Sequence, residues 1–244
     1  MFGRRFIPKI AAFFPTGTMN NSISRSRNAW LLTGQYNKYA SSAKSKRRSK
    51  DRLCWKCSAI LKSAVEFFCP SCNIIQRPSK TATYFELLNS PKTFDINTTQ
   101  LAEEYKRLQW KLHPDKFSDL SKNEKSLSEE QSSLVNEAYH TLLKPLKRGL
   151  YLLNLNGVPV TEDEATSTDV KFLNAIMEKY EQISSDEEKA KEVYIENTGD
   201  LKECLKNVSS AFEKGDMETA RQEMVKLNYF SKIDEFIKER ESWD

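Results

Sequence analysis

The stretch His113-Pro114-Asp115-Lys116-Phe117 is the point around which the helices of this chain are arranged. It directly follows a segment, residues 99–112, whose apolar side chains repeat at helical spacing. Because proline disfavours the helical conformation at the residue before it, we expect this helix to end at His113. A second helical pattern begins near residue 128 and continues to 143. The sequence therefore predicts two long helices joined by a polar loop that opens with a histidine, a proline and an aspartate.

Further helices are expected on both sides of this pair. Either Thr98 or Thr99 can cap the long helix, since both hydroxyls suit an N-cap. After an acidic linker, the last three helical patterns are long enough to form an antiparallel bundle. The helices expected beyond the central pair cover residues 84–88, 145–155, 169–184, 186–214 (with a kink at Gly199) and 216–242.

Four cysteines within 19 residues form the second motif. Cys54 and Cys57 are separated by two residues, as are Cys69 and Cys72. Two such pairs are a strong signal for zinc, and four thiolate ligands leave no open position for catalysis. We therefore expect one structural Zn²⁺ per chain, with a disulfide pair or a bound iron–sulfur cluster as the alternatives.

The segment that carries these cysteines, residues 51–79, is too short to fold on its own apolar core. The metal would then supply its folding free energy. A zinc-ribbon-like β unit is expected, with a small hairpin between the two cysteine pairs. The residues proposed for that hairpin are Ile60, Leu61, Val65, Phe67 and Phe68.

The helical pair resembles a known family of protein modules. A helix–loop–helix with His-Pro-Asp in the loop is similar to the J-domain of Hsp70 co-chaperones. The surrounding motifs resemble its HscB branch, which serves iron–sulfur cluster biogenesis, and the four-cysteine unit resembles that of its metazoan mitochondrial members. The motifs that carry the resemblance are Tyr84-Phe85-Glu86-Leu87-Leu88, Tyr105-Lys106-Arg107-Leu108-Gln109, Val135-Asn136-Glu137-Ala138-Tyr139 and Gly149-Leu150-Tyr151-Leu152-Leu153.

The resemblance implies that the loop and the long helix dock on mitochondrial Hsp70. Asp115 would offer its carboxylate to an arginine of Hsp70, with His113, Pro114 and Lys116 beside it. At about 100° per residue, the basic side chains of the long helix lie opposite its apolar face. A solvated face is the alternative for an isolated helix, but the resemblance makes it a docking surface for an acidic patch. Its residues are Lys106, Arg107 and Lys111.

Catalysis by the chain itself is not expected. A histidine base needs a nucleophile or a metal beside it in a pocket. The sequence offers His113 only an ordinary loop hydroxyl, Ser118. We therefore expect a protein that is not an enzyme and that acts on the ATPase cycle of its partner.

The first helix of the expected bundle has more apolar residues than one core requires. Phe172, Ile176 and Ile183 suffice for the core. A second apolar stripe on the same helix consists of Leu173, Met177 and Tyr180. The last helix repeats this surplus with Val225, Tyr229 and Phe236. The alternatives are a wider core that also covers the J-domain and an exposed patch for a partner.

The resemblance implies that this second stripe binds an iron–sulfur cluster scaffold protein. Where the family often has an apolar residue after Leu173, this chain has Asn174, so the edge of the patch departs from the family pattern. Acidic side chains would form its rim. The expected scaffold-binding residues are Leu173, Met177, Glu178, Tyr180, Glu181 and Tyr229.

Charge divides the chain at residue 51. Residues 1–50 carry 11 Lys+Arg and no acidic residue, which predicts a mitochondrial transit peptide. The alternative is a disordered basic tail with a nuclear signal at 44–50. The remaining 27 basic residues face 34 acidic ones, a net charge of −7 that argues against nucleic-acid binding. No apolar run approaches the roughly 20 residues of a membrane span.

A mainly α-helical co-chaperone of the mitochondrial matrix is therefore expected. It would recruit the scaffold protein to mitochondrial Hsp70 and stimulate its ATPase, and a J-domain co-chaperone for a different client is the alternative. The expected organisation is a basic segment over 1–50, the zinc unit over 51–79, a J-domain over 80–156 and a scaffold-binding three-helix bundle over 157–244.

Overall fold

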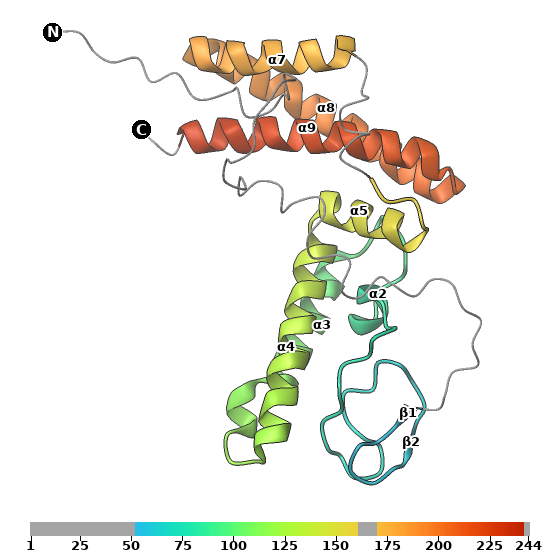
Figure 1. Cartoon of the computed structure of the whole chain (residues 1–244). Coiled ribbons are helices and arrows are strands. Elements are labelled where there is room, and N and C mark those ends of the chain that lie inside the picture. The colour runs from blue at the N-terminus through green and yellow to red at the C-terminus, as the bar shows by residue number, and fades with distance from the viewer. Residues whose placement is uncertain (1–51, 161–169, 242–244) are drawn as a thin grey trace, which may run out of the picture.

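The protein is mainly helical, as expected, with a J-domain hairpin, a C-terminal helical bundle and one small sheet (Figure 1). The computed structural model describes residues 52–160 and 170–241, so the expected transit segment lies outside the described residues. Its elements are β1 (Arg52–Leu53), β2 (Ile60–Leu61), α2 (Tyr84–Leu87), α3 (Thr98–Leu112), a 3-10 turn η3 (Pro114–Phe117), α4 (Lys122–Leu143), α5 (Pro145–Leu155), α7 (Val170–Ser185), α8 (Glu187–Lys214) and α9 (Met217–Glu241).

The ends of the hairpin helices are set by caps that differ from the prediction. Asn97, rather than Thr98 or Thr99, caps α3: its Oδ1 accepts from the N–H groups of Thr99 and Gln100 at 3.0 and 3.1 Å. Helix α4 begins at Lys122, six residues before the predicted start near residue 128. A capping box between Ser121 and Glu124 adds this extra turn and a half.

The hairpin closes around the apolar face that the periodicity predicts. Leu101, Leu108 and Leu112 of α3 are buried and belong to the same core as Leu134 and Leu142 of α4. On the same side, the rings of Tyr105 and Tyr139 stack with their centroids 4.1 Å apart. The two helices are therefore held side by side along their length, with η3 at one end.

Helix α5 joins the hairpin to the C-terminal bundle, and it packs directly on α9 (Figure 1). A Cβ atom added at Gly149 would overlap the side chain of Met224, which is fully buried. The rings of Phe94 and Phe212 stack across the same junction with their centroids 5.5 Å apart. Met224 and Leu227 belong to the same buried core as the J-domain leucines, so the two domains share one core.

Helices α7, α8 and α9 form the predicted bundle, with a second core of its own. Ile176 and Ile183 of α7 meet Val193 of α8 and Ile233 and Ile237 of α9. Helix α8 is one continuous helix through Gly199, the position at which a kink was predicted. It ends at Lys214, as predicted, with Gly215 as its C-cap in the left-handed conformation (φ 72°).

The surplus apolar residues of the bundle divide between buried and half-buried positions. Val225, one of the second apolar line of the last helix, is buried at 9% exposure, which at this position favours the wider core over an exposed patch. Phe172, expected in the core, is only half-buried. Its ring packs edge-on against Tyr229 and Phe230 of α9, and part of its surface is open to solvent. In the part of the chain that the structure describes, no helix is long and apolar enough to cross a membrane.

The small sheet lies around the first cysteine pair. Strands β1 and β2 pair antiparallel, with Arg52 opposite Leu61 and Leu53 opposite Ile60, so they flank Cys54 and Cys57. The predicted hairpin between the two cysteine pairs was therefore wrong in position. An isolated bridge between Phe68 and Ile75 flanks the second pair in the same way.

Candidate functional site

The four cysteines lie on two turns with the same backbone geometry. In the first, Cys54 N donates to Ala59 O (2.8 Å) and Ser58 N to Cys54 O (3.0 Å). In the second, Cys69 N donates to Ile74 O (2.9 Å) and Asn73 N to Cys69 O (2.9 Å). Ser58 and Asn73 both have positive φ, 57° and 54°. Each turn thereby directs two thiols to one side, as a metal-binding knuckle requires.

The sulfur atoms fit a tetrahedral metal site. All four Sγ atoms lie within 4.8 Å of one another, with Cys54 to Cys72 at 3.7 Å and Cys57 to Cys69 at 3.6 Å. A tetrahedral Zn²⁺ with bonds near 2.3 Å requires sulfur–sulfur distances of about 3.8 Å. A single metal ion therefore fits between these four residues, and because all four positions are protein ligands its role would be structural.

Backbone N–H groups favour ionisation of two of the thiols, because they lower the pKa of Cys54 and of Cys69. At Cys72 a backbone N–H group is outweighed by burial and by the neighbouring thiols, which raise the pKa to about 12. Lys56 N and Ser71 N each point at the sulfur of the cysteine two residues before, at 3.4 Å. Burial raises the pKa of the Cys54 thiol, but the N–H groups of Cys57 and Lys56 and the neighbouring thiols outweigh it and lower the pKa to about 6. A thiolate is the form that binds a metal.

The His-Pro-Asp loop presents its carboxylate to solvent. The Asp115 side chain is 90% exposed, and its Oδ2 lies 3.5 Å from His113 Nδ1. The same Nδ1 accepts a hydrogen bond from Asp115 N at 3.3 Å. Pro114 begins the 3-10 turn and Phe117 is buried beneath it, so the loop is anchored while its acid is free to meet another molecule.

The expected basic face of α3 lies on the exposed side of that helix. Lys106, Arg107 and Lys111 are all exposed there. Arg107 pairs with Glu104, and this hydrogen bond lowers the pKa of the Glu104 carboxyl. The pair reduces the positive charge of the face at that position, a contribution that counting charges along the sequence did not include.

Lys116 connects the loop to this basic face. Its Nζ lies 3.0 Å from the ring centroid of Trp110, whose side chain is 69% exposed. A cation over an aromatic face is a favourable contact. The loop and the end of α3 therefore present one continuous surface with an exposed acid, an exposed ring and several cations.

The second stripe of α7 lies along its edge with α9. Met177 is 40% exposed, and Glu178 and Glu181 beside it are exposed. Leu173 is half-buried. Tyr180 and Tyr229 are half-buried because each ring packs edge-on across this edge, on Phe236 at 5.2 Å and on Phe172 at 5.7 Å. Tyr180 and Tyr229 therefore lie at the contact between α7 and α9, while Met177, Glu178 and Glu181 are exposed on α7.

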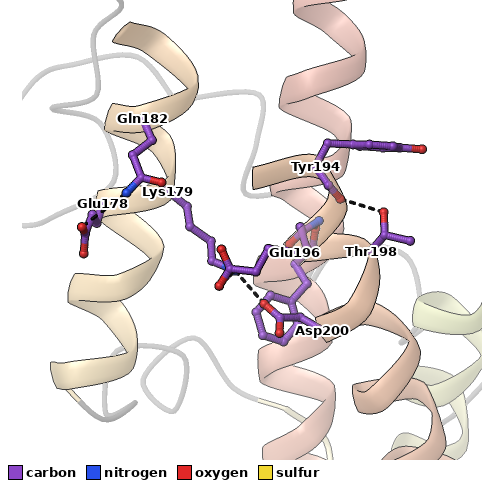
Figure 2. Close-up of polar contacts among 9 residues, drawn as sticks. Glu178, Lys179, Gln182, Tyr194, Glu196, Thr198 and Asp200 are labelled. Carbon is purple, nitrogen blue, oxygen red and sulfur yellow. Dashed lines mark hydrogen bonds and ion pairs between the residues drawn. The ribbon is translucent and has the colours of Figure 1, made fainter. Parts of the chain in front are cut away.

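A buried lysine holds α7 in place, and sequence reasoning missed it. Lys179, 8% exposed, forms ion pairs with Asp200 (2.6 Å) and Glu196 (3.2 Å) of α8. Figure 2 shows Lys179 extending from α7 toward these carboxylates, while Glu178 points away from them. The signal was available: Lys179 lies on the same face as Ile176 and Ile183, and two acidic residues lie one turn apart on α8.

Comparison with known proteins identifies both helical parts. Residues 83–151 match the family model described as DnaJ domain, and residues 168–238 match the one described as HSCB C-terminal oligomerisation domain. The human iron-sulfur cluster co-chaperone protein HscB is 43% identical over 189 residues, which are 76% of this chain and 80% of the human protein. The Arabidopsis thaliana HscB homolog is 32% identical over 92% of this chain and 91% of its own length.

A solved structure agrees with these matches. The crystal structure of human co-chaperone protein HscB superposes with a TM-score of 0.74 at 42% identity. The alignment covers 78% of this chain and 98% of the human one. With a J-domain, an HscB C-terminal domain and this degree of identity, the chain belongs to the HscB family of J-domain iron–sulfur cluster co-chaperones.

Proposed function

We propose that this protein binds an iron–sulfur cluster scaffold protein through the α7–α9 surface, recruits it to mitochondrial Hsp70 and stimulates the Hsp70 ATPase. The observation that carries the proposal is the fully presented carboxylate of Asp115, 90% exposed on an anchored loop. Aspartates are mostly exposed in folded proteins, so this exposure supports the proposal because the loop itself is fixed by Pro114 and the buried Phe117. Together with the J-domain match, its exposure favours a residue that waits for a partner cation.

The two surfaces would act in sequence on one Hsp70 molecule. The loop and the basic residues Lys106, Arg107, Lys111 and Lys116 would steer and hold Hsp70, a contact that weakens as salt screens it. The bundle would hold the scaffold protein near the substrate site of Hsp70. By binding one conformational state of Hsp70 more tightly than the other, the co-chaperone shifts its equilibrium toward hydrolysis and clamping.

The proposed function is tested with the wild-type protein. Mitochondrial Hsp70 is expected to hydrolyse ATP faster in its presence, and faster still when the scaffold protein is added, because both surfaces are then engaged. Single-turnover ATP hydrolysis measures both effects. Stimulation that is unchanged by the scaffold protein, combined with no binding in a pull-down, would favour a different client; no stimulation at all would exclude the proposal.

We assign the four-cysteine site to one structural Zn²⁺ per chain. The purified protein is expected to contain about one zinc ion, because four thiolates in a tetrahedron favour zinc over harder cations. Elemental analysis measures the content. A brown protein with iron and inorganic sulfide would instead indicate a cluster, and a metal-free protein with two disulfides would exclude both assignments.

The proposed location is the mitochondrial matrix. Its support is the acid-free, arginine-rich composition of residues 1–50, which lie outside the described part of the chain. In the matrix this protein would be in the same compartment as its proposed partner, mitochondrial Hsp70.

A further inference from the structure

Three buried polar residues lie between the four-cysteine unit and the His-Pro-Asp loop. Gln76, Ser128 and Gln131 are exposed by 1%, 0% and 2%, although serine and glutamine are mostly found at surfaces. Gln76 follows the second cysteine knuckle, and Ser128 and Gln131 lie three residues apart on one face of α4. Buried polar groups are usually hydrogen-bonded, so their partners indicate what they hold together.

Gln76 contacts both a cysteine of the metal site and helix α4. Its side-chain Nε2 donates to Cys54 Sγ at 3.4 Å and to Ile74 O at 2.9 Å. Its backbone carbonyl accepts a hydrogen bond from Gln131 Nε2 at 3.0 Å. Gln76 thereby connects the sulfur of a candidate metal ligand to α4, one of the two helices of the J-domain hairpin.

Ser128 continues this connection from α4 to the loop. Its hydroxyl donates to the carbonyl of Leu112 at 2.7 Å. Leu112 is the last residue of α3, and its carbonyl has no partner within the helix. The next residue is His113. The contacts therefore form a path from Cys54 through Gln76, α4 and Ser128 to the residue at which the loop begins.

The geometry of Gln131 indicates that this contact has a purpose beyond packing. Its Oε1 atom is buried and, among the described residues, meets no hydrogen-bond donor. An unpaired buried amide oxygen is unfavourable, and a leucine of similar size would avoid it. Packing alone would therefore favour an apolar residue at position 131. Glutamine adds the hydrogen bond from its Nε2 to the backbone carbonyl of Gln76.

We propose that Gln76 and Gln131 are positioning residues that couple the metal site to the His-Pro-Asp loop. Metal loading holds Gln76 against Cys54, Gln76 holds α4, and Ser128 of α4 holds the end of α3. Release of the metal then loosens the loop that meets Hsp70. Neither glutamine ligates the metal or touches Hsp70. The inference rests on the metal assignment made above.

The first readout is metal release from the full-length protein into a chromogenic chelator. Gln131→Leu and Gln76→Leu are each expected to release the metal about tenfold faster, the lower end of the effect of removing such supporting contacts. Gln76→Leu removes the side-chain hydrogen bonds to Cys54 Sγ and Ile74 O, while its backbone carbonyl still accepts from Gln131. Gln100→Leu, at an exposed position of α3, is the matched control and should release metal at the wild-type rate.

The second readout is amide hydrogen exchange over residues 112–117, with α8 residues as the internal reference. Stripping the metal from wild type is expected to speed exchange in this loop about tenfold or more, as loss of a local constraint does. In Gln131→Leu the loop should already exchange fast while the metal is bound, and stripping should add less than about twofold. This pattern is the double-mutant signature of coupling through Gln131.

The outcomes separate the inference from the metal assignment. A metal-loaded Gln131→Leu protein with wild-type release and wild-type loop exchange would overturn the coupling and leave the zinc site intact; the shared apolar core would then be the only link. A wild-type protein that never contains metal would overturn both. If exchange in α8 also rises in Gln131→Leu, general unfolding is responsible, and Gln76→Leu is measured instead. Faster metal release and faster loop exchange in that variant would support the coupling, and wild-type values of both would overturn it.

Discussion

Asp115→Asn should abolish stimulation of the mitochondrial Hsp70 ATPase while binding to the scaffold protein stays at the wild-type level. The carboxylate is 90% exposed and, within residues 52–160 and 170–241, its one side-chain contact is to His113, so its loss should not disturb the fold. A buried charge pair that loses one charge at an interface costs about 2–5 kcal/mol, equivalent to at least about a thirtyfold weaker contact. Single-turnover hydrolysis at a co-chaperone concentration near the half-maximal value for wild type measures the effect.

The matched control for this variant is Asp119→Asn. Asp119 is an exposed aspartate four residues further along the same loop, so the change in net charge is identical. It should retain full stimulation if position rather than charge is what matters. Equal loss of ATPase stimulation and scaffold binding by Asp115→Asn would point to misfolding and contradict the assignment of Asp115.

Leu173→Ala combined with Met177→Ala should weaken binding of the scaffold protein by about 2–4 kcal/mol, the range for two central apolar anchors. This corresponds to a Kd about 30- to 1000-fold higher. Because Met177 is 40% exposed and Leu173 half-buried, most of the effect should appear in binding rather than in stability. Isothermal titration with the scaffold protein measures it, and ATPase stimulation without scaffold should stay unchanged.

Adding Tyr229→Ala should weaken binding further, but it must be read together with thermal unfolding. Tyr229 packs on Phe172, so its removal also loosens the contact between α7 and α9. The control is Tyr194→Ala with Ile195→Ala, two apolar residues of α8 that are 41% and 72% exposed. If the α7 variants instead change the molecular mass in light scattering and leave scaffold affinity unaltered, the surface serves self-association.

Helical periodicity was sufficient to predict most of the fold. The apolar repeats located every long helix, and Pro114 located the end of α3, because burial of one face dominates the choice of secondary structure. Helix starts were less accurate. Asn97 and Ser121 cap their helices through one or two side-chain hydrogen bonds to backbone N–H groups, and neighbouring threonines and serines compete for the same role.

Long-range pairings were the part that the sequence could not supply. The sheet consists of strands two residues long, too short for an alternating pattern, so its position around the first cysteine pair was missed. Lys179, Gln76 and Gln131 each have a partner between 17 and 55 residues away in sequence. The place of Lys179 on the apolar face of α7 could be read from helical spacing, but the contacts of Gln76 and Gln131 carry no periodic signal.

The packing of Gly149 on Met224 has a consequence for how the two partners meet. Because the hairpin and the bundle have a common interior, neither can swing on the linker outside the described residues without breaking that interior. The distance and the angle between the hairpin and the bundle are therefore fixed, and a protein bound to one would lie at a fixed position relative to a protein bound to the other. Substitutions at Gly149 or Met224 would change this relative position while leaving each binding surface intact.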